Sequence, residues 1–292
     1  MAFTLQIKQK RIFGKTVLDI PSLARACGLC YGSVDGFHIL QAEKLEGGTA
    51  ICYDPARIGR GIFLDASKAG EGRYEVQYNI PTTRAEIGAF TRLAQEIERR
   101  LGRAEMYCVE EERTFTGKEL EQGIETFAQF SLRSLNQFCG DKTYSHYILP
   151  LALWPYTLPE EKVAAWRDCA DLSDFEETLH RLQSMDIYYA KPQLRVKSAT
   201  KEIGAFYALT EDCRSVFPVR ADGFLNLDEI KVAEGFIQLV LYQEKRVLEG
   251  LIPYERFIQE MERRGVQRFD EDHILVPPMG KEELEGLAER LR

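Results

Sequence analysis

The stretch RYEVQYNIPTTRAEIGAFTRLAQEIERRLG, residues 73–102, joins a strand pattern directly to a helix pattern. From Tyr74 to Tyr78 every second residue is apolar, which is the period of a half-buried antiparallel strand. From Ile87 to Leu101 the apolar residues are spaced by three and four, which predicts an amphipathic helix of about five turns.

Capping residues predict where two long helices begin. Thr83 stands three residues before Glu86, which is the spacing of a capping box. The same spacing recurs between Thr116 and Glu119, ahead of a second apolar stripe that stops at Gly140. Both helices are therefore defined by local signals at their ends as well as by their apolar periodicity.

The residues before the first long helix are rich in short runs of β-branched and aromatic residues separated by Gly, Asp and Pro. Strands are predicted over residues 4–10, 17–20, 36–41, 49–53 and 73–80. A short helix is expected over residues 21–27, because Pro21 is tolerated in a first helical turn. The N-terminal region is therefore expected to be rich in β-structure.

After Gly140 the chain changes character, and strand-like and helix-like segments are mixed, ending in a predicted helix over residues 281–292. There is no regular alternation of strand and helix, which would indicate a parallel sheet. The fold class is therefore α+β: a β-rich N-terminal lobe followed by amphipathic helices, then a second mixed α+β lobe. We expect domains at residues 1–140 and 141–292, with a single compact unit as the alternative.

Composition bounds the function. The chain of 292 residues carries 38 Lys and Arg against 46 Asp and Glu, a formal net charge of −8. Nucleic-acid binding requires clustered positive charge, so no nucleic-acid partner is expected. No apolar run approaches the ~20 residues that span a bilayer, and no secretory signal is recognised. Seven scattered cysteines are typical of reduced thiols, which predicts a cytoplasmic protein. No membrane association and no cofactor are expected.

Cys27 and Cys30 form a Cys-x-x-Cys pair, the spacing of thioredoxin-type redox motifs and of half a zinc site. The pair follows the predicted short helix, so it lies at the end of the helix dipole that disfavours a thiolate. A zinc site needs four ligands, and Cys52 is the one other thiol nearby. Redox and metal roles stay open, but two incidental thiols are the simpler interpretation.

The most distinctive segment is YDPARIGRGI, residues 53–62. Arg57 and Arg60 supply charge, while Gly59 and Gly61 allow a ligand to approach the backbone closely. We therefore predict an anion site at these four residues. The alternative is a tight turn with surface arginines, since no P-loop pattern is present.

The four histidines are dispersed, so no metal site is predicted from them. His273 follows three acidic residues, Asp270, Glu271 and Asp272. This run is interpreted as a solvated loop that precedes a strand.

Several motifs of the N-terminal third resemble an uncharacterised family, a domain of unknown function found mostly in Gram-positive bacteria. The motifs are residues 13–15, 27–32, 53–62, 80–83 and 86–87. The resemblance implies a bacterial cytoplasmic protein, and it brings no catalytic residues to this chain.

Two function classes remain from the sequence. The favoured one is a non-catalytic binding or regulatory protein, whose partner, another protein or a small anion, contacts the β-rich lobe. The alternative is an enzyme that acts on a small anionic substrate in a crevice between the lobes. A deep pocket joining Arg57 or Arg60 to carboxylates would favour the enzyme, and a flat exposed surface would favour the binding protein.

Overall fold

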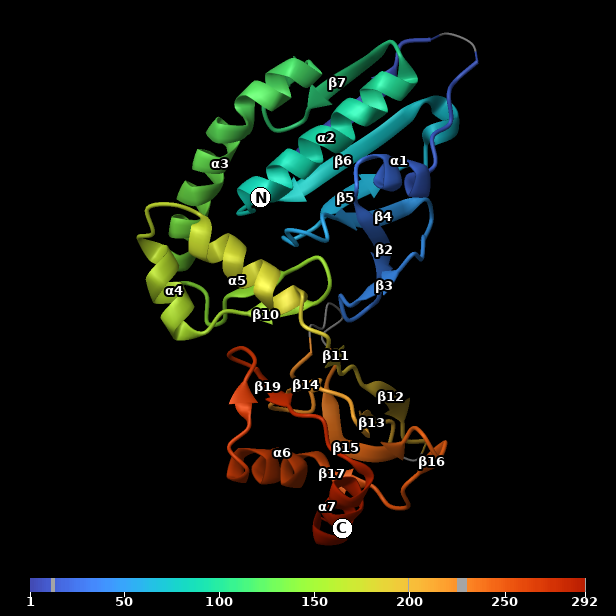
Figure 1. Cartoon of the computed structure of the whole chain (residues 1–292), viewed down its shortest axis with the longest axis vertical. Coiled ribbons are helices and arrows are strands. Elements are labelled where there is room, and N and C mark those ends of the chain that lie inside the picture. The colour runs from blue at the N-terminus through green and yellow to red at the C-terminus, as the bar shows by residue number, and fades with distance from the viewer. Residues whose placement is uncertain (12–13, 199, 225–229, 292) are drawn as a thin grey trace. The chain divides into compact units, whose positions relative to one another are not determined.

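The computed structural model describes residues 1–11, 14–198, 200–224 and 230–291 (Figure 1). It divides into two compact units, unit 1 from Met1 to Met185 and unit 2 from Asp186 to Arg292. The boundary expected at residues 140 and 141 lies inside unit 1. The helices over Gly117–Gly140 and Glu160–Arg167, one on each side of this boundary, are in contact: Asn136 Nδ2 donates a hydrogen bond of 2.8 Å to the Trp166 carbonyl.

Within its described residues, unit 1 contains an antiparallel sheet of eight strands in the order β3-β2-β4-β5-β6-β1-β7-β8. The strands are β1 (Ala2–Gln9), β2 (Cys30–Val34), β3 (Leu40–Ala42), β4 (Thr49–Tyr53), β5 (Ile62–Asp65), β6 (Arg73–Asn79), β7 (Ala104–Cys108) and β8 (Arg113–Phe115). A 3-10 helix, η1 (Ala69–Glu71), precedes β6, and β9 (Ile148–Pro150) pairs with β10 (Pro155–Thr157) in a separate two-stranded sheet.

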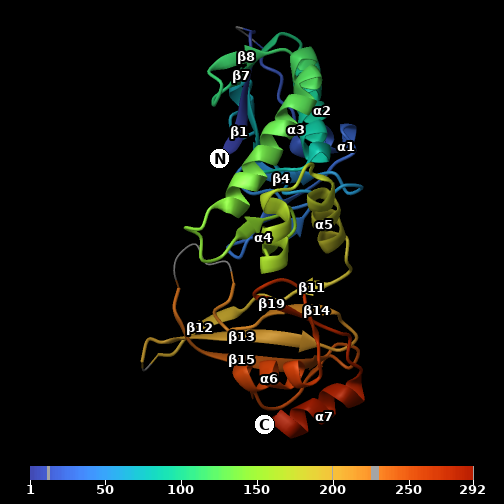
Figure 2. The same cartoon turned by 90° about the vertical axis from the view of Figure 1, so that its left-hand side faces the viewer.

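Helices cover one face of the large sheet (Figure 2). They are α1 (Ile20–Ala26), α2 (Arg84–Leu101) and α3 (Gly117–Gly140), with α4 (Glu160–Arg167) and α5 (Ser173–Gln183) following later in the chain. The predicted stripe of α2 packs onto the sheet: the ring of Phe90 lies 4.8 Å from that of Tyr78 and 5.7 Å from that of Phe3, both edge to face. Burial of a side chain such as Phe90 contributes about 3–5 kcal/mol relative to alanine.

Unit 2 contains two further sheets within its described residues, ordered β11-β14-β19-β18 and β12-β13-β15-β16, with β17 also paired to β15. Their strands are β11 (Tyr188–Tyr189), β12 (Gln193–Val196), β13 (Ile203–Thr210), β14 (Ser215–Pro218), β15 (Val232–Leu241), β16 (Arg246–Val247), β17 (Ile252–Pro253), β18 (Gln267–Arg268) and β19 (His273–Val276). Helices α6 (Tyr254–Arg263) and α7 (Lys281–Leu291) complete the unit. Its core contains Tyr207, Phe217 and Phe257, all nearly inaccessible to solvent.

The α+β class and the β-rich N-terminal region are confirmed, and both long helices begin after the expected threonines. The capping box is complete at Thr116 and Glu119, whereas at Thr83 only the threonine half forms, because the side chain of Glu86 binds elsewhere. The strand predicted over residues 17–20 is wrong. Asp19 is instead the N-cap of α1, where its Oδ1 accepts a hydrogen bond of 2.9 Å from Ser22 N. Phe13 of the resemblance motifs and Arg292 of the last predicted helix lie outside the described residues.

Candidate functional site

The segment predicted to bind an anion connects β4 to β5 in unit 1. It begins with a turn in which Asp54 Oδ1 accepts from Ala56 N at 3.0 Å and the Asp54 carbonyl accepts from Arg57 N at 3.1 Å. The Arg57 side chain is exposed, and its Nη1 lies 4.0 Å from Glu177 Oε2, which is also exposed. An exposed ion pair at this distance stabilises little, because water screens it.

Arg60, three residues later, is in a different environment, with only 8 % of its surface exposed. Its Nη1 donates to the Pro81 carbonyl at 2.9 Å and its Nε donates to the Pro150 carbonyl at 3.2 Å. Burial lowers the pKa of the guanidinium to about 10, and the nearby carboxylate of Glu86 opposes that shift. The guanidinium of Arg60 is thus engaged by carbonyl groups of the protein itself.

Glu86, in the first turn of α2, is the acidic counterpart of Arg60. It is buried, and its Oε2 accepts from Gly61 N at 2.6 Å while its Oε1 accepts from the Thr82 hydroxyl. Burial raises the pKa of this carboxyl, and the hydrogen bonds from Thr82 and Gly61 and the charge of Arg60 act in the opposite direction. The group is held by a specific set of donors, as a buried carboxylate requires.

Both glycines of the segment are needed for close packing. A Cβ at Gly59 would lie 2.5 Å from Glu86 Oε2, and one at Gly61 would lie 2.5 Å from Ile51 Cγ2. Gly61 also has a φ of +90°, a left-handed conformation that glycine adopts without strain. The space that the glycines leave is therefore filled by the protein's own carboxylate and side chains.

Helix α5 closes the same segment from the other side. Gln183 Nε2 donates to the Gly59 carbonyl at 2.7 Å, and Ile58 N donates to His180 Nδ1 at 3.2 Å. Gln183 Oε1 in turn accepts from Leu153 N at 2.9 Å. We call Gly59, Arg60, Gly61, Glu86 and Gln183 the anchor cluster, since it fixes the β4–β5 connection to α2, α5 and the β9–β10 hairpin.

The sequence identified Arg60 and the two glycines but not the roles of Glu86 and Gln183. Glu86 was recognised as a capping residue alone. It also stands four residues before Phe90, on the apolar stripe of α2, and a carboxylate at such a position signals a buried partner. Arg57 and Arg60 do not come together, and an anion site formed by both remains a prediction.

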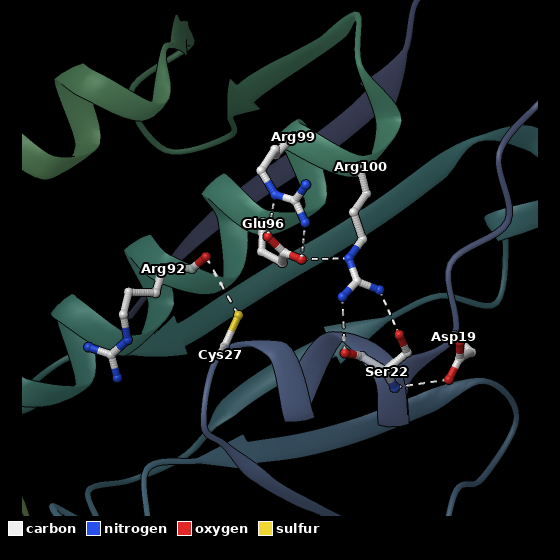
Figure 3. A network of polar contacts seen from close by, with 7 residues as sticks. All are labelled: Asp19, Ser22, Cys27, Arg92, Glu96, Arg99 and Arg100. Atoms are coloured by element: carbon white, nitrogen blue, oxygen red, sulfur yellow. Dashed lines mark hydrogen bonds and ion pairs between the residues drawn. The ribbon is translucent and has the colours of Figure 1, made fainter.

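Cys27 and Cys30 lie on different elements. Cys27 is the C-cap of α1, and its Sγ contacts the Arg92 carbonyl of α2 at 3.7 Å (Figure 3). Burial, followed by the charge of Glu96, raises the pKa of the Cys27 thiol, so little thiolate is present at neutral pH. Cys30 is exposed on β2, and both thiols are free. The environment of Cys27 does not favour a nucleophilic thiol.

In the described residues no group of three or more His, Cys, Asp and Glu side chains is arranged to hold a metal ion. The same part of the chain contains no helix that is both long enough and apolar enough to cross a membrane.

The interpretation of residues 270–273 as a solvated loop is wrong for Asp270 and His273. Asp270 and His273 are buried in unit 2, with Asp270 Oδ1 2.7 Å from His273 Nδ1 and Tyr189 Oη 2.9 Å from His273 Nε2. Pairing of β14 with β19 and of Phe269 N with the His273 carbonyl draws the run into the core. Burial chiefly raises the pKa of Tyr189 well above its ordinary range, so its hydroxyl remains protonated.

The fold and the anchor cluster define an α+β protein in which the motifs at residues 53–62, 80–83 and 86–87 meet in one buried polar cluster. The chain belongs to the family described as a domain of unknown function (DUF4299), whose model matches residues 2–287. The resemblance was expected over the N-terminal third alone, and this is corrected, because the match extends over nearly the whole chain. Neither the curated proteins nor the solved structures contain a significant match.

Proposed function

We propose that this protein is a non-catalytic binding protein whose partner, another protein, contacts the uncovered face of the large sheet in unit 1. The uncovered face is the side of β5, β6, β1 and β7 opposite to α1, α2 and α3 (Figures 1 and 2). Its residues alternate with the buried ones: Gln6 and Lys8 of β1 are exposed, whereas Leu5 and Ile7 are buried.

The pattern of charge on the uncovered face carries this proposal. Lys8 lies directly opposite Arg73 in the β1–β6 pair, and Asp65 lies directly opposite Glu75 in the β5–β6 pair. Like charges placed directly across neighbouring strands destabilise a sheet. The two pairs are adjacent, so two basic residues stand beside two acidic ones on this face. On its other side Lys8 is opposite Glu105 of β7, whose carboxylate lies 2.6 Å from Lys10 Nζ.

Contacts within the chain offset only part of the repulsion between these like charges. Arg73 Nη1 lies 3.4 Å from Glu71 Oε2, an exposed pair, and Glu75 Oε2 accepts from Gln6 Nε2 at 3.3 Å. Within the part of the chain that the structure describes, Lys8 has no ion-pair partner. A partner protein with carboxylates opposite Lys8 and Arg73 would offset the repulsion, and charge complementarity of this kind gives specificity and fast association.

The shape of the surface agrees with a protein partner. A shallow hollow of about 300 Å³ lies between Lys8, Lys68, Arg73 and Glu75. On β7, Tyr107 lies opposite Gln6 and is 38 % exposed. Tyrosine is enriched in protein interfaces because it combines an apolar ring with a polar hydroxyl. The surface therefore combines a charge pattern with an aromatic contact point.

The test is quantitative capture of partners from a lysate of the source organism by the tagged full chain. The Lys8→Glu/Arg73→Glu variant reverses the charge of both basic residues, while the Arg133→Glu/Lys142→Glu variant changes two exposed cations at α3 and just after it. We expect at least one protein to be depleted about tenfold with the first variant and retained with the second, and to bind the purified parent chain. If the two variants and the parent capture the same proteins equally, the uncovered face is not the binding surface.

A further inference from the structure

We infer that unit 2 contains a binding site for a small organic carboxylate with an apolar body, in a pocket of about 610 Å³ beside the C-terminal end of α6. This volume is in the range of small-ligand sites, about 300–1,000 Å³. All the residues that line the pocket belong to unit 2 and to the part of the chain that the structure describes. The site is therefore separate from the uncovered face of unit 1.

The walls of the pocket are held by backbone contacts. Gly265, with a φ of +69°, reverses the chain after α6, and Val266 N then donates to the Met261 carbonyl at 3.2 Å. Leu275 of β19 is paired with Gln267 of β18. The Met279 carbonyl accepts from Asp212 N at 2.9 Å, which fixes the far wall.

The floor of the pocket is apolar. Val266 and Leu275 are half-buried, and Met279 is buried against the core of unit 2. The exposed parts of Val266 and Leu275 form a surface on which a hydrocarbon group gains about 25 cal/mol for each Å² that it removes from water.

The charged groups at the rim are not equivalent. The guanidinium of Arg264 is already paired with two carboxylates of the protein. Its Nη1 lies 2.7 Å from Glu283 Oε1, and its Nε lies 3.0 Å from Glu260 Oε1. Arg214 stands immediately before β14, with its backbone carbonyl bonded to Tyr188 N at 2.9 Å. In the described residues the Arg214 guanidinium has no ion-pair partner. Arg214 thus lines the pocket as an exposed arginine whose charge is not neutralised by an acidic side chain of the described residues.

This charge balance selects the class of ligand. A single guanidinium presents a planar fork of donors that matches one carboxylate group. The carboxylate of Glu283 at the same rim would repel the second charge of a dianion such as phosphate. A monoanion with a hydrocarbon chain fits both Arg214 and the apolar floor.

The experiment is a ligand-observed NMR titration of the full chain with hexanoate, using 1-hexanol and inorganic phosphate as comparison probes. Hexanoate is expected to bind one site saturably, with a dissociation constant on the order of 1 mM, as a ligand of this size allows. Hexanol should bind more weakly, and phosphate should not displace hexanoate at equal concentration.

Variants locate the site. Arg214→Gln should raise the dissociation constant of hexanoate about tenfold, because the carboxylate loses a charge-assisted hydrogen bond. Arg195→Gln, a change at an exposed arginine of β12 outside the pocket, should leave binding unchanged. Val266→Phe should reduce binding by filling the floor, and the thermal melt of each variant confirms that it is folded. The inference is overturned if hexanoate does not saturate, if Arg214→Gln binds as the parent does, or if hexanol or phosphate binds as well as hexanoate.

Discussion

Gly61 N donates a hydrogen bond of 2.6 Å to Oε2 of Glu86, and this bond joins the β4–β5 connection to the first turn of α2. The two residues are 25 positions apart in the chain, and both are inaccessible to solvent. The negative charge of this side chain also interacts with the buried positive charge of Arg60. The anchor cluster therefore depends on a single acidic side chain.

Replacement of Glu86 by alanine is expected to lower the free energy of unfolding by about 3–5 kcal/mol, because Gly61 N, the Thr82 hydroxyl and the Arg60 charge lose their buried partner. Glu86→Gln retains an acceptor for Gly61 N and should cost less. Urea unfolding at neutral pH measures both. The matched control is Glu125→Ala on α3, where the side chain is exposed and the change should stay within about 0.5 kcal/mol. Equal stability of Glu86→Ala and Glu125→Ala would contradict the role given to Glu86.

Gly59→Ala tests whether the glycines serve packing. The added Cβ would lie 2.5 Å from Glu86 Oε2, so we expect destabilisation of about 1–3 kcal/mol by overpacking. Gly36→Ala is the control, since a Cβ there meets no atom within 4 Å and the backbone has no positive φ. Thermal melts of the two variants are compared with the parent. A Gly59→Ala protein as stable as Gly36→Ala would show that the segment can open without cost.

Glu96 on α2 predicts a pH dependence. Its carboxylate accepts from Arg99 Nε at 2.7 Å and from Arg100 Nε at 2.5 Å, and Arg100 continues to Ser22 Oγ at 2.6 Å (Figure 3). These bonds hold the pKa of Glu96 at about 2, below its ordinary value of 4.5. The stabilisation is therefore present above pH 4.5 and is lost as the pH falls toward 2.

The Glu96→Gln variant should accordingly be less stable than the parent at pH 7 by about 1 kcal/mol, the upper end for a solvent-screened pair. The difference should shrink between pH 4.5 and 2. Urea unfolding at pH 7, 4 and 3 measures it. A gap that stays constant over this range would mean that the ion pairs do not stabilise the folded chain.

The cysteines predict a graded reactivity. All seven are free, Cys30 is exposed, and Cys52 and Cys139 are buried, which raises the pKa of each of these two thiols to about 12. A thiol reagent should label Cys30 first in the native protein and reach Cys52 and Cys139 after unfolding. Under denaturing, non-reducing conditions seven thiols should be counted. A count of five would reveal a disulfide, and loss of labelling in Cys30→Ser identifies the fast site.

Local sequence signals were sufficient for elements whose stabilising contacts are themselves local. Thr83 and Thr116 each accept a hydrogen bond from the backbone N–H three residues later, so both helix starts could be predicted without knowledge of the fold. Residues 17–20 were misread, because the short apolar run before Pro21 has the composition of a strand, whereas Asp19 uses its side chain to cap α1. The expected boundary at residues 140 and 141 rests on a change in composition, and a change in composition carries no information about the contact between α3 and α4.

The sequence by itself determined the α+β class, the two long helices and the alternation that makes one face of the N-terminal sheet buried and the other polar. These features follow from spacings of two, three and four residues along the chain. Only the tertiary structure decided what Arg60 does. Its guanidinium is bound by the Pro81 and Pro150 carbonyls, 21 and 90 residues away in the chain. Whether an arginine faces a ligand or its own protein depends on such distant partners, because the partners exist only once the chain has folded.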